Sequence, residues 1–316
     1  MHNKRIYDYD FVKGILITLM VIFHLTLTSQ SFLIVKEWVY VFHMSGFLVL
    51  SGYFFNDDKS KFLKTFTGIL WPYLIFNTLY MVGLSVMQNY LPTNNSVEPG
   101  LLPILTQVLI KPAGTYWYLH TMAICMLGTF VASRLRCSLF NQLLIAMTLL
   151  FIVSLLVEGF SFIHVIYFMI GYVLRKSGSD MRTIIRPSLL SIIPIVLITI
   201  FCADLARHTL SGIALTLVML SFLLAIYKYL PRALLRNLFV WIGRNSIAIV
   251  LFSPVFTIAT KLFAPLFAFD TTQTLWSVVS TIFVIMATLL CARICDKIKF
   301  SHLIMHRNMY VPYTQV

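Results

Sequence analysis

The chain has 316 residues, of which 59% are apolar and only 11% are charged, and its net charge is +13. Water-soluble domains carry roughly 25% charged residues, so this composition excludes a soluble globular protein. The basic residues stand in short runs between apolar segments, which is typical of membrane topology and argues against a nucleic-acid-binding surface. We therefore predict an all-α polytopic protein of the lipid bilayer that forms one domain over residues 1–316.

Ten apolar segments are long enough, or nearly so, to cross a bilayer as a helix, which takes roughly 20 residues. They are residues 10–29, 38–56, 65–87, 116–133, 139–157, 160–174, 187–204, 209–228, 238–260 and 275–293. The first segment lacks a small-residue cleavage site, so we interpret it as a retained helix and not as a signal peptide. The five cysteines are scattered without the spacing of a zinc site or a disulfide framework, so no metal site is expected.

The distribution of basic residues orients the predicted segments. Most of the 24 lysines and arginines, including Lys4 and Arg5, fall on one side, which the positive-inside rule assigns to the cytoplasm. The outer loops carry Lys36, Lys111, Arg207 and Lys261. We therefore expect both termini in the cytoplasm and the longest outer loop at about residues 88–115.

Two ionisable residues lie in the first segment, which begins DFVKGILITLMVIFH. Lys13 and His24 are eleven residues apart. In a helix this spacing places them on one face, roughly 16 Å apart along the axis. Ionisable groups inside a membrane are costly and usually face a bundle interior or a wet cavity, so we predict a functional stripe. Taken alone, His24 would also fit a structural hydrogen bond to a neighbouring helix or a proton relay in a transporter.

The second segment, VYVFHMSGFLVLSGYFF, adds a second histidine, His43, at a depth similar to that of His24. Two histidines at one depth on adjacent helices favour a catalytic role. The small residues of this segment allow another helix backbone to approach closely, so Ser51 is interpreted as a packing residue and not as a nucleophile.

These two segments resemble the opening helices of the acyltransferase-3 family, bacterial inner-membrane O-acyltransferases that modify surface polysaccharides and related glycans. The matching residues are Asp10, Lys13, Gly14, His24, His43, Met44, Phe47, Leu50, Ser51, Gly52 and Tyr53. WPYLIF, GTYWYLHTM and WIGRNSIAIV resemble later family segments in the same order, so the resemblance covers about residues 8–250. The chain departs from the family pattern in having Lys13 for an arginine, Ser45 for a proline, and Val250 and Ser253 for a late tyrosine and histidine. Lys13 keeps the positive charge but lacks the planar fork of arginine.

The resemblance implies that acetyl-coenzyme A arrives from the cytoplasm as the donor, and that no cofactor is permanently bound. It also implies that the acceptor is a sugar or a lipid-linked glycan and that the protein resides in the inner membrane. We expect Lys13 to bind donor phosphates, helped by Asp10 and by Arg244, unless Arg244 extends to the interface instead. We expect His24 and His43 to be catalytic, because a neutral imidazole suits proton abstraction. Whether His24 acts as base or nucleophile stays open.

Three further residues are expected near the acceptor. Trp117 and Tyr118 would stack on a sugar ring, unless they belong to an interfacial aromatic belt. Glu158 would orient a histidine or bind acceptor hydroxyls, unless it is a solvated loop carboxylate. The alternative function is a transporter or flippase of a glycan or lipid-linked intermediate, although paired broken helices and internal symmetry are absent from the sequence. A sensor or scaffold without chemistry would not need two histidines at one depth.

Overall fold

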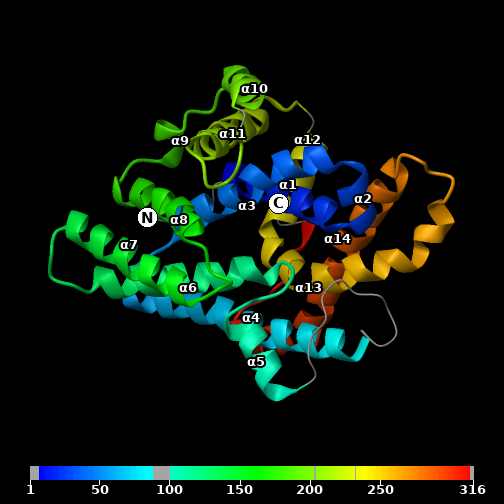
Figure 1. Ribbon diagram of the computed structural model, residues 1–316, viewed down its shortest axis with the longest axis horizontal. Helices are drawn as coiled ribbons and strands as arrows, with labels where there is room; N and C mark the ends of the chain where they lie inside the picture. The colour runs from blue at the N-terminus through cyan, green and yellow to red at the C-terminus, as the bar shows by residue number, and fades with distance from the viewer. Residues whose placement is uncertain (1–6, 88–99, 203, 232, 314–316) are drawn as a thin grey trace.

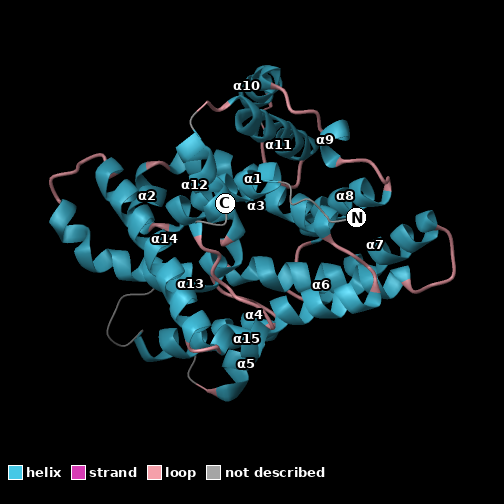
Figure 2. Ribbon diagram, turned by 180° about the vertical axis from the view of Figure 1, so that it is seen from behind, coloured by secondary structure: helices cyan, strands magenta, loops and turns pink. Residues whose placement is uncertain are grey.

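The computed structural model describes residues 7–87, 100–202, 204–231 and 233–313. The basic residues Lys4 and Arg5, and positions 88–99 of the predicted outer loop, lie outside these residues. Within the described residues all regular structure is helical and no strand occurs (Figures 1 and 2). The elements are α1 (Tyr7–His24), α2 (Thr26–Ser31), α3 (Leu33–Phe54), α4 (Lys59–Met87), α5 (Leu101–Leu109), α6 (Tyr116–Ser133), α7 (Leu139–Leu156), α8 (Phe162–Lys176), α9 (Met181–Ile184), η1 (Leu189–Ser191), α10 (Ile192–Phe201), α11 (Leu210–Tyr229), α12 (Ala233–Arg244), α13 (Ser246–Ala259), η2 (Thr260–Phe267), α14 (Thr274–Lys297) and α15 (Phe300–Met305).

The prediction of an all-α membrane protein is confirmed. Each predicted segment coincides with helical structure, but three of them are interrupted: α1 ends at His24 before α2, η1 and α10 share one segment, and α12 meets α13 at Asn245. Among the described residues, six helical stretches are long and apolar enough to cross a membrane: α3, α4, α7, α11, α13 with η2, and α14. The count of ten spans and the cytoplasmic placement of both termini stay predictions.

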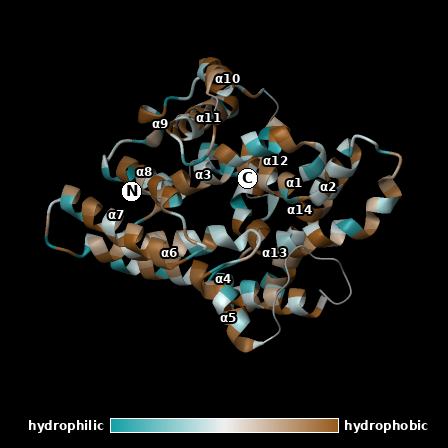
Figure 3. Ribbon diagram, viewed as in Figure 1, coloured by the Kyte–Doolittle hydropathy of each residue, from teal (hydrophilic) through white to brown (hydrophobic). Residues whose placement is uncertain are grey.

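Helix α1 lies at the centre of the bundle and contacts α3, α11, α12, α13 and α14. Its first turn carries Asp8 and Asp10, whose negative charges favour the positive end of the helix dipole. Further along, Leu16 and Ile17 are fully buried. In contrast, α7 and α10 expose most of their leucine and isoleucine side chains, and Figure 3 shows these helices as largely apolar. Exposed apolar surface of this extent suits contact with lipid.

Glycines allow two pairs of helices to pack backbone against backbone. A Cβ atom at Gly14 of α1 would lie 1.9 Å from the carbonyl oxygen of Phe239 in α12, and a Cβ atom at Gly243 would lie 1.8 Å from that of Asp10. At Gly171 of α8 a Cβ atom would lie 1.9 Å from a carbonyl oxygen of α3. Only glycine fits such crossings, and Gly52 of the second segment makes one too, because its Cβ atom would lie 1.9 Å from the Phe168 carbonyl oxygen; this glycine serves helix packing, as predicted.

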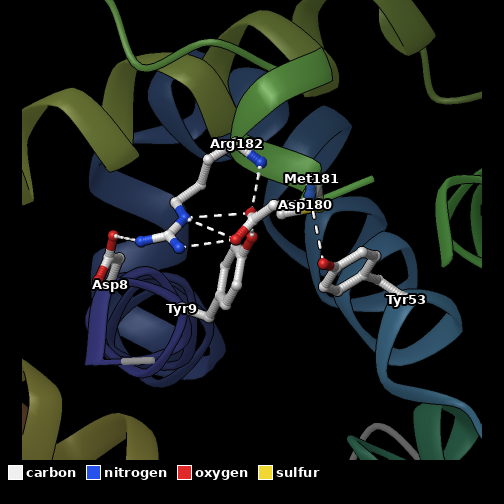
Figure 4. Close-up of polar contacts among 6 residues, drawn as sticks. All are labelled: Asp8, Tyr9, Tyr53, Asp180, Met181 and Arg182. Carbon is white, nitrogen blue, oxygen red and sulfur yellow. Dashed lines mark hydrogen bonds and ion pairs between the residues drawn. The ribbon is translucent and has the colours of Figure 1, made fainter. Parts of the chain in front are cut away.

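A polar cluster holds the beginning of α1 in place, and Figure 4 shows its members: Asp8, Tyr9, Tyr53, Asp180, Met181 and Arg182. The Arg182 guanidinium contacts the Asp180 carboxylate at 2.6 Å and that of Asp8 at 2.8 Å, and the Tyr9 hydroxyl donates to Asp180 at 2.7 Å. These hydrogen bonds, led by those of Arg182, hold the pKa of Asp180 below its ordinary value. The cluster therefore fixes the helix that carries Lys13 and His24.

Candidate active site

A cavity of about 200 Å³ lies beside Lys13, near the N-terminal end of α1. Helices α1, α3, α4, α6 and α13 line it, together with Arg307 from the C-terminal segment. A second hollow of about 140 Å³ shares Lys13, Ser51, Ile69 and Met122 with it. We call the first space the Lys13 cavity. The hydroxyl groups of Ser51 and Tyr118, 2.7 Å apart, stand on its wall.

Lys13 is anchored by neighbours on its own helix and on α3. Its Nζ lies 3.5 Å from the Asp10 carboxylate, one helical turn earlier, and 4.5 Å from the ring centroid of Phe54. Asp10 is almost fully buried, with 5% of its surface exposed. A buried carboxylate would repel a phosphate, so the geometry suits Asp10 for orienting Lys13 better than for touching an anionic ligand.

The C-terminal strap, residues 306–313, brings Arg307 to the same cavity. Asn245 holds the strap by donating to the Val311 carbonyl oxygen (3.1 Å) and accepting from the Val311 amide (2.8 Å). The carboxylate of Asp296 accepts from the amides of Met309 and Tyr310, both at 2.9 Å. Asn245, in the motif WIGRNSIAIV, thus has a structural role: it follows the end of α12 and binds the strap. Two cations from opposite ends of the chain consequently line one cavity.

Arg244 is the last residue of α12, next to Gly243, which packs against the backbone of Asp10. It therefore lies at the same end of α1 as Lys13, as the sequence predicted. The end of α1 where Lys13 and the cavity lie is rich in positive charge.

The other end of α1 carries the two histidines, one on each side of Tyr40 (α3). The ring centroids of His24 and Tyr40 are 6.2 Å apart, and those of Tyr40 and His43 are 5.1 Å apart. His24 is partly exposed, whereas His43 has only 3% of its surface exposed. The prediction that these histidines lie at one depth on adjacent helices therefore agrees with the structure.

Both imidazoles are oriented by a hydrogen bond to their own helix. Nδ1 of His24 lies 2.8 Å from the Met20 carbonyl oxygen, and Nδ1 of His43 lies 2.8 Å from that of Val39. A carbonyl oxygen can only accept, so each Nδ1 carries the proton. In the neutral ring the lone pair is then on Nε2, which can accept a proton or attack an electrophile.

Three residues that sequence reasoning did not select stand near the histidines: Arg207, His164 and Tyr40. The guanidinium carbon of Arg207 lies 6.0 Å from the ring centroid of Trp117, and Trp117 stacks on His164 with centroids 4.6 Å apart. Arg207 acts electrostatically on both His43 and His164. The sequence signal for Arg207 was slight: a single cation in a loop otherwise poor in positive charge.

The residues expected near the acceptor separate into three environments. Trp117 lies beside His164 and Arg207, and its stacking on a sugar ring stays a prediction. Tyr118 differs from the expectation, because its side chain turns to the other face of α6 and lines the Lys13 cavity. Glu158 forms an exposed ion pair with Lys111 at 2.6 Å, so its partner is a lysine and not a histidine. This position favours the interpretation of Glu158 as a solvated loop carboxylate.

Comparison with known proteins assigns the chain to a family. The model of a family described as an acyltransferase domain matches residues 6–293. A nodulation protein, NolL of Mesorhizobium japonicum (strain LMG 29417 / CECT 9101 / MAFF 303099), is 31% identical over 132 residues, which are 37% of this chain and 33% of that protein. The chain therefore matches only about one third of the length of this curated relative. No solved structure matches the chain. The family match covers nearly the whole sequence, and the protein belongs to the acyltransferase-3 family.

Proposed function

We propose that this protein is a membrane-bound O-acyltransferase that moves an acyl group, most simply acetyl, from acyl-coenzyme A to a sugar hydroxyl. The acceptor would be a cell-surface glycan or its lipid-linked precursor. One observation carries the proposal: a single central helix presents Lys13 to a cavity at one end and the Nε2 lone pair of His24 at the other.

The Lys13 cavity is the proposed site for the donor phosphates. Two cations on its wall, Lys13 and Arg307, match the negative charge of a diphosphate. Arg307 would supply the planar fork that Lys13 lacks. Since Lys13 and His24 lie roughly 16 Å apart along the helix, a long flexible arm such as that of coenzyme A could place its thioester near His24.

The histidine end is the proposed site of chemistry. The acceptor oxygen attacks the thioester carbonyl carbon while its proton passes to Nε2 of His24. The carbon–sulfur bond then breaks, and the proton leaves with the thiol of coenzyme A. His43 would hold the acceptor hydroxyl through its own Nε2. The hydrogen bond from Nδ1 to Met20 keeps the ring of His24 in the orientation and tautomer that this step needs.

The proposed topology is ten spans in a bacterial inner membrane, with both termini and the Lys13 cavity on the cytoplasmic side. Donor and acceptor would then approach from opposite faces. A glycan transporter is the alternative. It would move the acceptor without acylating it, and the oriented Nε2 atoms favour acyl transfer.

The test is acyl release from radiolabelled acetyl-coenzyme A by purified protein with a mixture of sugar acceptors. His24→Ala is compared with His120→Ala, because Nε2 of His120 is already occupied by the Leu109 carbonyl oxygen, at 2.9 Å. Lys13→Ala is compared with Lys61→Ala, an exposed lysine. We expect the His24 variant to lose turnover but bind donor, and the Lys13 variant to bind donor more weakly. Both controls should keep the activity of the native chain.

Native protein that neither binds nor consumes the donor would refute the proposal. Acceptor movement across vesicles without acylation would favour the transporter instead. A labelled enzyme trapped after mixing with donor alone would reassign His24 from base to nucleophile.

A further inference from the structure

The segment between α10 and α11 places a cation among aromatic rings at the histidine end of the bundle. The Tyr167 hydroxyl donates to the carbonyl oxygen of Arg207 at 2.8 Å, which fixes the backbone of this segment. The guanidinium then faces the ring of Trp117, which stacks on His164. Side chains from α6 and α8 thus meet around one arginine.

Among the described residues, no carboxylate forms an ion pair with Arg207. In the parts of the chain that the structure describes, Lys111, Lys176 and Arg182 each pair with an aspartate or glutamate, whereas Arg207 has no such pair. Burial lowers the pKa of the guanidinium from its ordinary value, so the charge is held partly away from water. A cation in such a position is costly unless an anion accompanies it.

Two neighbouring imidazole nitrogens also lack a partner within the described residues: Nε2 of His43 and Nδ1 of His164. Both are shielded from water, and buried polar atoms in native proteins are generally hydrogen-bonded. The His43 side chain is almost fully buried, with 3% of its surface exposed. Unsatisfied atoms beside an uncompensated cation point to a polar ligand with both hydroxyl groups and a negative charge.

We propose that the acceptor carries an anionic group, a carboxylate or a phosphate, and that Arg207 binds this group beside Trp117 and His164. This inference rests on the proposed function and names the class of its acceptor. The fork of the guanidinium matches either anion with two parallel hydrogen bonds. The unpartnered Nε2 of His43 would accept a hydrogen bond from one hydroxyl group of the sugar.

The test measures binding by calorimetry, without donor, of three probes: methyl glucoside, methyl glucuronide and glucose 1-phosphate. The first two differ by one carboxylate, and the third represents a phosphate-linked sugar. The native chain is compared with Arg207→Gln, with Arg207→Lys, and with the control Lys111→Gln, whose native lysine pairs with Glu158. Circular dichroism and gel filtration verify that each variant is folded.

We expect the native chain to bind at least one anionic probe about ten-fold more tightly than the neutral one, as charged hydrogen bonds allow. Arg207→Gln should abolish this preference, Arg207→Lys should keep part of it, and Lys111→Gln should keep it all. A preference for the glucuronide would indicate an acidic sugar, and one for the phosphate a phosphate-linked precursor.

Equal affinity of the native chain for all probes, or no binding of either anion, would overturn the inference. An equal loss of affinity for neutral and anionic probes in Arg207→Gln would also overturn it, because the role of Arg207 would then be only structural. Since no donor is present, the result is separate from the acyl-transfer assay. Anion binding without acyl transfer would refute the proposed enzymatic activity but support the Arg207 site. Acyl transfer without a preference for anionic probes would support the activity but refute the site.

Discussion

Release of the C-terminal strap by Asp296→Ala should weaken donor binding without slowing the chemical step. The Asp296 carboxylate accepts two backbone hydrogen bonds, from Met309 and Tyr310, each 2.9 Å long. Hydrogen bonds to a charged group contribute roughly 1.5–3 kcal/mol, and the lower value applies because this carboxylate is partly exposed. Two such bonds give about 3 kcal/mol, which corresponds to about a hundred-fold change in the opening equilibrium of the strap.

Hydrogen exchange measures this opening directly. We expect the amides of Met309 and Tyr310 to exchange about a hundred-fold faster in the variant. The KM for the acyl donor should rise toward that of Arg307→Ala, because the strap carries Arg307 into the Lys13 cavity. The kcat should stay near that of the native enzyme, since the strap does not touch the histidines.

Two controls separate the strap from general destabilisation. Asn245→Ala removes the bonds to Val311 but leaves those of Asp296, so exchange should accelerate mainly at Val311 while Arg307 stays in place. Asp58→Ala removes an exposed carboxylate and should change neither readout. Unchanged protection of Met309 and Tyr310 in Asp296→Ala, or an unchanged donor KM once the strap is released, would refute the reasoning.

Three other predictions concern packing, the donor site and pH. Gly171→Ala should lower stability by about 1–3 kcal/mol through overpacking, whereas Gly83→Ala should be neutral because Gly83 has open space around it. Equal melting temperatures of the two variants would contradict the crossing geometry. Lys13→Arg should retain or improve donor affinity in equilibrium binding, and a loss as large as that of Lys13→Ala would argue against a phosphate role. The Arg182 hydrogen bonds depress the pKa of Asp180 below its ordinary 3.8, so their stabilisation is present above that pH and is lost as the pH falls further. The melting temperature of the native chain should therefore exceed that of Asp180→Asn at pH 7, and the difference should shrink below about pH 4; a difference that grew on acidification would contradict this assignment.

Apolar segment length located the helices, because a bilayer demands long uninterrupted runs of apolar residues. The 3.6-residue period of a helix placed Lys13 and His24 on one face, and α1 is continuous from Tyr7 to His24. The interruption at Asn245 was not predicted, because segment length alone counted residues 238–260 as one continuous apolar span. Its cause is a tertiary one: the Asn245 side chain binds the strap.

The parts of the site that sequence reasoning missed come from contacts between distant segments. Arg307 was not selected as a site residue, because nothing in its local sequence shows that the strap returns to α1. Arg207 lies between α10 and α11 and His164 lies in α8, and only tertiary packing brings both residues to Trp117. Tyr118 was assigned to the same side as Trp117, although adjacent residues of a helix project about 100° apart.

The two glycine crossings also restrict how the molecule can move. Helices α1 and α12 touch backbone to backbone, as do α3 and α8, so neither pair can slide or rotate internally without a collision of main-chain atoms. Each pair is therefore expected to move as one unit, so that Lys13 and His24 keep a constant geometry on α1 while His43 on α3 moves with α8. Entry of donor or acceptor is expected to involve motion between these pairs or of other elements. Helix α6 meets the cavity through Met122, a long flexible side chain, and so is suited to act as the moving wall.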